Sequence, residues 1–141
     1  EQRTKLMGIY MSTINIKNEN IVHLAESYYR AMLAKDFDSM GSYLHDNVHF
    51  IGPLAEMRGK ESVVLAANNL SKILTEINIR SKFLSGNQVM FVYDFLFSTL
   101  NLNLRSAGLL DFTNGKISKI ELFYDGRPFE KKKDEIFIQN K

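Results

Sequence analysis

Residues 86–97 read Gly-Asn-Gln-Val-Met-Phe-Val-Tyr-Asp-Phe-Leu-Phe, and this stretch decides the fold class. From Gln88 onward the side chains alternate between two sets with a period of two residues, which is typical of a β-strand. The Gly86-Asn87 pair in front of the strand is a tight hairpin signal. Asp94 lies on the face opposite to four rings, those of Phe91, Tyr93, Phe95 and Phe97. The sequence therefore predicts an antiparallel strand with an aromatic face that other elements must cover.

Further β-patterns lie on both sides of this strand. Residues 77–83 precede it with the same two-residue period, and residues 100–112 and 117–124 follow it. The Asn114-Gly115 pair between the last two segments is the strongest short hairpin signal in the chain. An earlier β-compatible segment covers residues 47–51. We therefore expect five strands, of which the last four form a meander.

Three segments in the first half of the chain have helical periodicity. Residues 17–34 carry apolar side chains three and four positions apart, and residues 60–74 show the same stripe. Asp36 can cap a second, shorter helix between them. The sequence predicts an α+β fold of order α-α-β-α-β-β-β-β, with three N-terminal helices on the concave face of a curved, mixed, mainly antiparallel sheet. Where the helices do not fill the concave side, we expect an apolar pocket.

The composition is that of a single globular domain. The chain has 141 residues, of which 45% are hydrophobic, and it has no cysteine, so disulfides and thiolate metal sites are excluded. Its apolar runs are far shorter than the about 18 residues that a membrane span needs, and the first residues lack the order of a secretory signal. We therefore expect a cytoplasmic protein. We interpret residues 1–16 as a flexible extension or an expression remnant and residues 130–141 as a charged tail.

The charge pattern argues against nucleic acid or membrane partners. The 18 basic and 16 acidic residues give a net charge of +2, and the excess lies at the two ends of the chain. A nucleic-acid-binding domain concentrates basic residues on a folded face, whereas Lys131, Lys132 and Lys133 read as part of a solvated tail. The three histidines have no paired spacing, and no phosphate-binding glycine motif occurs. The sequence predicts neither a metal nor a cofactor.

Three groups of residues carry a resemblance to a known family. They are YYRAMLAKDFD at 28–38, then LHDNVHFIGP at 44–53 with RGKESV at 58–63, and finally NGKI at 114–117 with FYDGRPF at 123–129. In order and spacing the chain resembles the nuclear transport factor 2-like superfamily, in particular its SnoaL-like branch of polyketide cyclase and ketosteroid isomerase-like proteins. The resemblance implies a cystatin-like cone with a pocket and a SnoaL-like domain over residues 17–129. It does not decide the function, because this superfamily hosts many activities.

The resemblance also implies which acid and base groups to look for. Tyr28 falls where isomerases of this type keep a tyrosine that donates a hydrogen bond to a developing oxyanion. Their general-base aspartate falls at Gly52, and their second acid falls at about Gly108. The Arg-x-Asp stretch that epoxide hydrolases of this fold use does not occur. The known acid and base sets of the family are therefore incomplete in this chain.

Three residues remain as catalytic candidates. Tyr28 can donate a hydrogen bond, although it can equally be a core tyrosine. His49 lies near the expected pocket mouth, but strand parity turns it away if Val48 and Phe50 point inward. Asp94 could serve as a buried base, yet its parity places it on the convex face, where Arg80 or Arg105 can pair with it. The expected ligand-binding residues are Tyr28, Phe50, Tyr93, Phe95, Phe97, Leu110 and Tyr124.

Three functions follow as hypotheses. The first is a SnoaL-like protein that binds a small, mostly apolar molecule in the cone without the known carboxylates. The second is an isomerase, cyclase or hydratase acting on a polyketide-like or steroid-like substrate, with Tyr28 as donor and His49 or Asp94 as base. The third is an interaction module in which side chains fill the cone. The convex face mixes apolar and polar residues, so we also expect a homodimer through the sheet.

Overall fold

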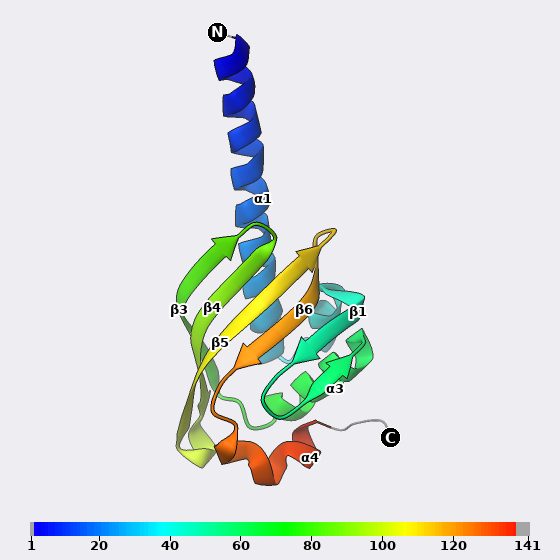
Figure 1. The fold of residues 1–141 in the computed structure, drawn as a ribbon. Coiled ribbons are helices and arrows are strands. Elements are labelled where there is room, and N and C mark those ends of the chain that lie inside the picture. The colour runs from blue at the N-terminus through cyan, green and yellow to red at the C-terminus, as the bar shows by residue number, and fades with distance from the viewer. Residues whose placement is uncertain (1, 138–141) are drawn as a thin grey trace.

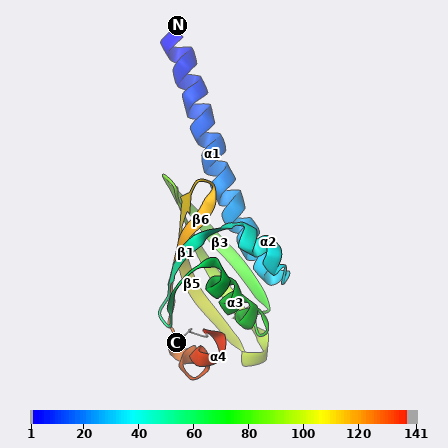
Figure 2. The same cartoon turned by 90° about the vertical axis from the view of Figure 1, so that its right-hand side faces the viewer.

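Helices pack against one face of a curved sheet, which confirms the predicted α+β class (Figure 1). The computed structural model describes the backbone of residues 2–137 and the side chains of residues 2–9 and 20–137. The helices that cover the sheet lie on the same side of it (Figure 2). The helical elements are α1 (Gln2–Leu33), α2 (Phe37–Ser42), α3 (Lys60–Ser71), the 3-10 turns η1 (Ser98–Leu100) and η2 (Arg127–Lys132), and α4 (Lys133–Ile136).

The sheet is mixed and has six strands in the order β2-β1-β6-β5-β4-β3. All neighbours are antiparallel except β1 and β6, which run parallel. The sequence predicted five strands and missed β2, which is only three residues long and too short to show a period. The strands are β1 (Leu44–Ile51), β2 (Glu56–Arg58), β3 (Glu76–Ser85), β4 (Gln88–Phe97), β5 (Leu102–Thr113) and β6 (Lys116–Phe123).

Helix α1 starts earlier than predicted and ends where predicted. Its backbone is helical from Gln2, and its N-terminal half projects beyond the sheet as a single helix (Figures 1 and 2). At the other end Lys35 adopts a left-handed conformation with φ of 58°. The amides of Lys35 and Asp36 then donate to the carbonyls of Met32 and Ala31, which is the Schellman arrangement that terminates helices. Asp36 in turn caps α2 by accepting from the Ser39 amide at 3.2 Å.

A bulge in β3 reverses its alternation. The pairing with β4 shifts between Ile79 and Ser81, so that Ile79 pairs with Tyr93 but Phe83 pairs with Met90. The sequence pattern places Phe83 on the same face as Ile77 and Ile79. In the structure Phe83 lies on the other, convex face and is 58% exposed. An unbroken period cannot reveal a bulge, because the register shift depends on the partner strand.

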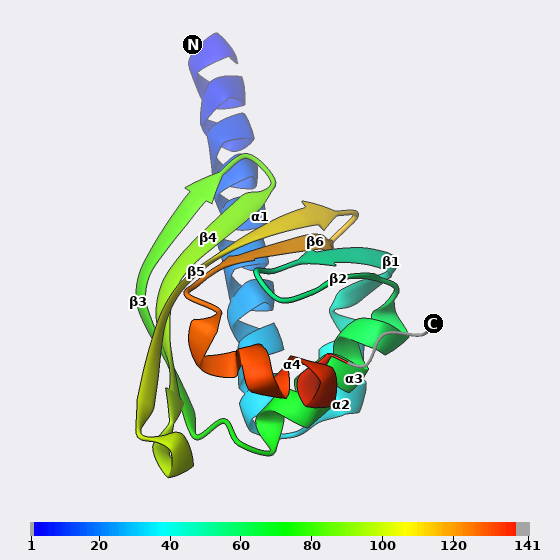
Figure 3. The same cartoon turned by 60° about the horizontal axis from the view of Figure 1, so that its bottom comes forward.

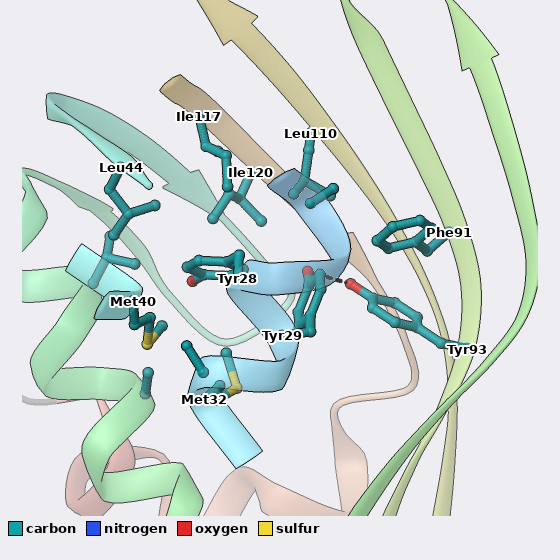
Figure 4. Packing of buried hydrophobic residues seen from close by; sticks show 14 of the residues in the cluster. Tyr28, Tyr29, Met32, Met40, Leu44, Phe91, Tyr93, Leu110, Ile117 and Ile120 are labelled. Carbon is teal, nitrogen blue, oxygen red and sulfur yellow. Dashed lines mark hydrogen bonds between the residues drawn. The ribbon is translucent and has the colours of Figure 1, made fainter. Parts of the chain in front are cut away.

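The aromatic face of β4 forms the centre of the core. Every second side chain of β4 is buried, from Val89 to Phe97. The ring of Tyr29 on α1 packs edge-on against the rings of Phe91 and Tyr93, and α1 crosses the concave side of the sheet (Figure 4). Burying large apolar surfaces of this kind is the main favourable term in folding. The sequence-based prediction that helices cover this face is confirmed.

The last described turns also join the core. Phe129 of η2 and Ile136 of α4 are almost fully buried, whereas Lys131, Lys133 and Glu135 around them are exposed. The sequence reading treated residues 130–141 as a charged tail, because three lysines dominate the local composition. The structure adds one buried apolar anchor, Ile136, in the described part of that stretch, and a second, Phe129, directly before it. These turns cross the end of the cone that lies opposite the projecting half of α1 (Figure 3).

The bulge predicts very different costs for two similar substitutions on neighbouring strands. Phe91→Ala should lower the free energy of unfolding by about 3–5 kcal/mol, because its ring is buried in the core. Phe83→Ala should cost less than about 1 kcal/mol, because that ring lies on the convex face. Urea unfolding of both variants at low protein concentration measures the difference. Equal losses would place both rings in the core and contradict the bulge.

Candidate functional site

A cavity of about 70 Å³ lies between α1, α3 and the concave face of the sheet. Helix α1 contributes one wall, α3 the facing wall, and strands β1, β4, β5 and β6 the floor. The turns η2 and α4 close its far end. The lining residues are Tyr28, Tyr29, Met32, Phe50, Leu54, Met57, Val63, Ala66, Ala67, Leu70, Phe95, Phe97, Leu104, Ile120, Leu122, Tyr124, Phe129, Ile136 and Phe137. The sequence predicted a pocket at this place in the fold.

The lining is apolar apart from three tyrosine hydroxyls. Among residues 2–9 and 20–137, no carboxylate, imidazole or amine belongs to it. Tyr28 is 2% exposed, and neither its hydroxyl nor that of Tyr124 makes a hydrogen bond within residues 2–137. Tyr29 differs, because its hydroxyl lies 2.6 Å from that of Tyr93. The cavity therefore offers a bound molecule two unpaired hydroxyls and no group suited to abstract a proton near neutral pH.

Burial keeps these hydroxyls protonated. Desolvation raises the pKa of Tyr28 well above the usual value for tyrosine, and the neighbouring Tyr29 raises it further. Desolvation also raises the pKa of Tyr124 to about 12. A group with a raised pKa stays neutral at every pH below that value. Both side chains are thus hydrogen-bond donors across the physiological range and do not act as bases.

The Tyr29–Tyr93 pair fills the space beside Gly108, the position at which the resemblance implied a second acid. Gly108 lies diagonally across from Tyr93 on the neighbouring strand, and a Cβ atom built on Gly108 would overlap the Tyr93 hydroxyl. Figure 4 shows that this hydroxyl points to Tyr29, while the oxygen of Tyr28 points the other way. A larger side chain at position 108 therefore cannot coexist with the tyrosine pair in this packing.

Position 52 also offers no side chain that could act as a base. The Gly52 amide donates to the Ala55 carbonyl at 2.8 Å, which closes the turn between β1 and β2. A Cβ atom at Gly52 would lie 3.3 Å from the Phe50 ring, which lines the cavity. A side chain added at this position would therefore press against the Phe50 ring.

The other two catalytic candidates do not line the cavity. The Nε2 atom of His49 lies 2.7 Å from Oε1 of Glu56 on the edge strand β2. Asp94 pairs with Arg80 at 3.2 Å, as its strand parity predicted, and its second oxygen is buried without a hydrogen bond to any described residue. Of the three candidates, the structure brings only Tyr28 to the cavity.

Five of the seven expected ligand-binding residues line the cavity and two do not. Tyr93 is buried beyond the lining because its hydroxyl turns to Tyr29, and Leu110 packs in the core deeper in the sheet. The five that line it are Tyr28, Phe50, Phe95, Phe97 and Tyr124.

Sequence reasoning missed other lining residues for two reasons. Tyr29 follows Ala25 by four positions and precedes Met32 by three, so the helical stripe contained the signal for its burial. Phe129, Ile136 and Phe137 stand alone in a charged stretch with no long periodic pattern around them. Their inward placement follows from the tertiary fold.

Comparison with known proteins agrees with the fold. Residues 25–120 match the SnoaL-like domain. The chain therefore belongs to the SnoaL-like family, as its motifs predicted. A comparison with the curated proteins finds no match.

Solved structures show the same fold. An NTF2-like protein of unknown function from Cytophaga hutchinsonii is 23% identical, with a TM-score of 0.67 over 77% of this chain and 93% of that one. An LEH-like epoxide hydrolase from M. tuberculosis is 16% identical, with a TM-score of 0.69 over 79% and 86%. A de novo designed protein with a curved β-sheet is 22% identical, with a TM-score of 0.75 over 84% and 95%. A hydrolase and a designed protein share this cone, so the fold alone does not define an activity.

The close approach of Gly108 and Tyr93 predicts that substitutions at these two positions have non-additive effects on stability. Gly108→Ala should destabilise the protein by about 1–3 kcal/mol, because the new methyl group overpacks against Tyr93. Tyr93→Phe removes the obstructing oxygen, so the double variant should lose less stability than the sum of the two single variants. Gly41→Ala is the matched control, since its Cβ would lie 3.7 Å from its nearest neighbours. Additive losses in urea unfolding would contradict the contact.

Proposed function

We propose that this protein binds a small, mostly apolar, uncharged molecule inside the cone. The observation that supports this most directly is the cavity of about 70 Å³, whose lining is apolar except for tyrosine hydroxyls. A charged ligand would lose its hydration there without gaining a counter-charge, which is strongly unfavourable. An apolar molecule would gain roughly 25 cal/mol for each Å² that it buries.

The unpaired hydroxyls suggest one further property of the ligand. Tyr28 on α1 and Tyr124 after β6 both line the cavity and remain protonated. Because neither hydroxyl makes a hydrogen bond within residues 2–137, each is free to donate to an acceptor on a bound molecule. We therefore infer that the bound molecule presents an oxygen or nitrogen acceptor to one of them.

An isomerase, cyclase or hydratase has less support than a binding protein. Proton transfer needs a base within hydrogen-bond reach of the substrate, and His49 and Asp94 pair with other residues away from the lining. Size also argues against a steroid-like substrate in this conformation. A cavity of about 150 Å³ accepts benzene, and this cavity has less than half that volume. The third hypothesis, a fully filled cone, has less support because a cavity is present.

A cavity-filling substitution tests the binding site. Ala66→Phe places a ring into the lining and should weaken binding of a small apolar probe, xenon, at least tenfold in an NMR titration. Leu65→Phe is the matched control, because Leu65 precedes it on α3 but is 43% exposed and does not line the cavity. Equal affinities for both variants, or no xenon binding to the unmodified chain, would refute the proposed site. Native mass spectrometry of the purified protein would identify a natural ligand.

We also propose that two copies associate through the convex face of the sheet. Cross-strand neighbours there form an apolar group, which we call the convex patch, and two of its rings are at least half exposed. Exposed apolar clusters of this kind often mark an interface, and a two-fold axis would let the patch meet itself. The convex patch consists of Phe83, Met90, Val92, Ala107, Leu109 and Phe123.

A charge placed in the convex patch should separate the copies. Met90 pairs with Phe83 on one side and Leu109 on the other, so Met90→Glu would bury a carboxylate among apolar groups. We expect the dissociation constant in sedimentation velocity to rise at least 100-fold. Leu65→Glu on α3 is the control and should leave a dimer intact. A chain that sediments as a monomer without any substitution would contradict the proposed dimer.

A further inference from the structure

We propose that residues 127–137 form a displaceable plug that regulates access to the cavity. This C-terminal plug comprises η2, α4 and Phe137, and its three apolar side chains Phe129, Ile136 and Phe137 occupy the end of the cone where a larger ligand would lie. The inference rests on the proposed binding function and adds its regulation. The cavity is small because the chain itself fills part of it.

The plug is buried through apolar anchors. Phe129 and Ile136 are 3% and 4% exposed, and all three anchors line the cavity. The Phe129 ring packs edge-on against Phe97 with centroids 5.0 Å apart, and the Phe137 ring lies 6.3 Å from Phe50. Both partner rings belong to the lining. The plug therefore contacts the same apolar surface that a ligand would use, so ligand and plug compete for it.

The plug has little polar attachment to the rest of the fold. Helix α4 is a single turn of four residues, which is not stable without tertiary contacts. The Asn69 amide on α3 donates to the Ile136 carbonyl at 3.2 Å, which joins α4 to the body. The remaining side chains of α4 are charged and exposed, and they stay hydrated whether the plug is closed or open. Displacement thus costs mainly the apolar contacts, which a bound ligand would replace.

The plug follows the rest of the cone in the chain. The family match ends at residue 120, and the last strand, β6, ends at Phe123. All six strands and the three N-terminal helices precede the plug in the chain. The plug crosses the open end of the cone after the sheet is complete (Figures 1 and 3). It can therefore open as a local unit while the sheet remains folded.

A single cysteine reports this opening, because the chain has none of its own. Ile136→Cys places a thiol in the plug, and Ala67→Cys places a matched thiol in the α3 wall of the same cavity. Without ligand, the thiol at 136 should react with a disulfide reagent at least tenfold faster than the thiol at 67. Its rate should be nearly independent of low urea concentrations, because local opening exposes little surface. Phe137→Cys repeats the test if the first variant does not fold.

If the thiols at positions 136 and 67 reacted at equal rates with equal urea dependence, both would be exposed only by global unfolding. That result would overturn the proposal of a displaceable plug. A second measurement adds N-phenyl-1-naphthylamine, an uncharged probe too large for the closed cavity. Binding should accelerate labelling at 136 at least fivefold and should not accelerate labelling at 67. Binding that slows labelling at 136 would overturn regulation by displacement. Failure of xenon to bind would contradict the proposed function separately, and the urea dependence of labelling would then decide by itself whether the plug opens.

Discussion

The structure depends on one constraint, which is that the aromatic concave face of the sheet must be shielded from water. The buried rings of β4 extend along ten residues of a curved sheet, and one helix does not cover them all. Tyr28, Tyr29 and Met32 of α1 lie on one side of the cavity, and α3 lies on the facing side. The C-terminal turns cover the remaining end. The cavity is the space that these coverings do not fill.

The packing of Tyr93 beside Gly108 also decides which polar groups line the cavity. Tyr93 turns its hydroxyl to Tyr29 and takes the space above Gly108. An acidic side chain cannot be accommodated at position 108 in this packing. Gly52, directly after β1, also has no acidic side chain. What remains polar in the lining is a set of protonated tyrosines. The packing of the core therefore leaves the described lining with hydrogen-bond donors and without a base.

Much of the site could be predicted from short-range patterns. Strand parity placed Phe95 and Phe97 on the lining and Asp94 opposite them beside Arg80, because alternation persists along an unbroken strand. It failed at Phe83, where a bulge shifts the register of β3 against its neighbour β4. It placed Tyr93 on the concave face correctly, but it could not show that the Tyr93 hydroxyl pairs with Tyr29 of α1, 64 residues away, outside the cavity lining.

The sequence by itself determined the cone, the order of its helices and strands, the aromatic face and the lack of the familiar acids. These follow from local periodicity, capping and turn signals, which act over a few residues. Only the tertiary structure decided the size of the cavity and the pairing of Tyr29 with Tyr93. It also decided that Ile136 and Phe137 fold back into the cone. These features depend on how side chains from segments distant in the sequence pack together, and a local sequence pattern does not contain that information.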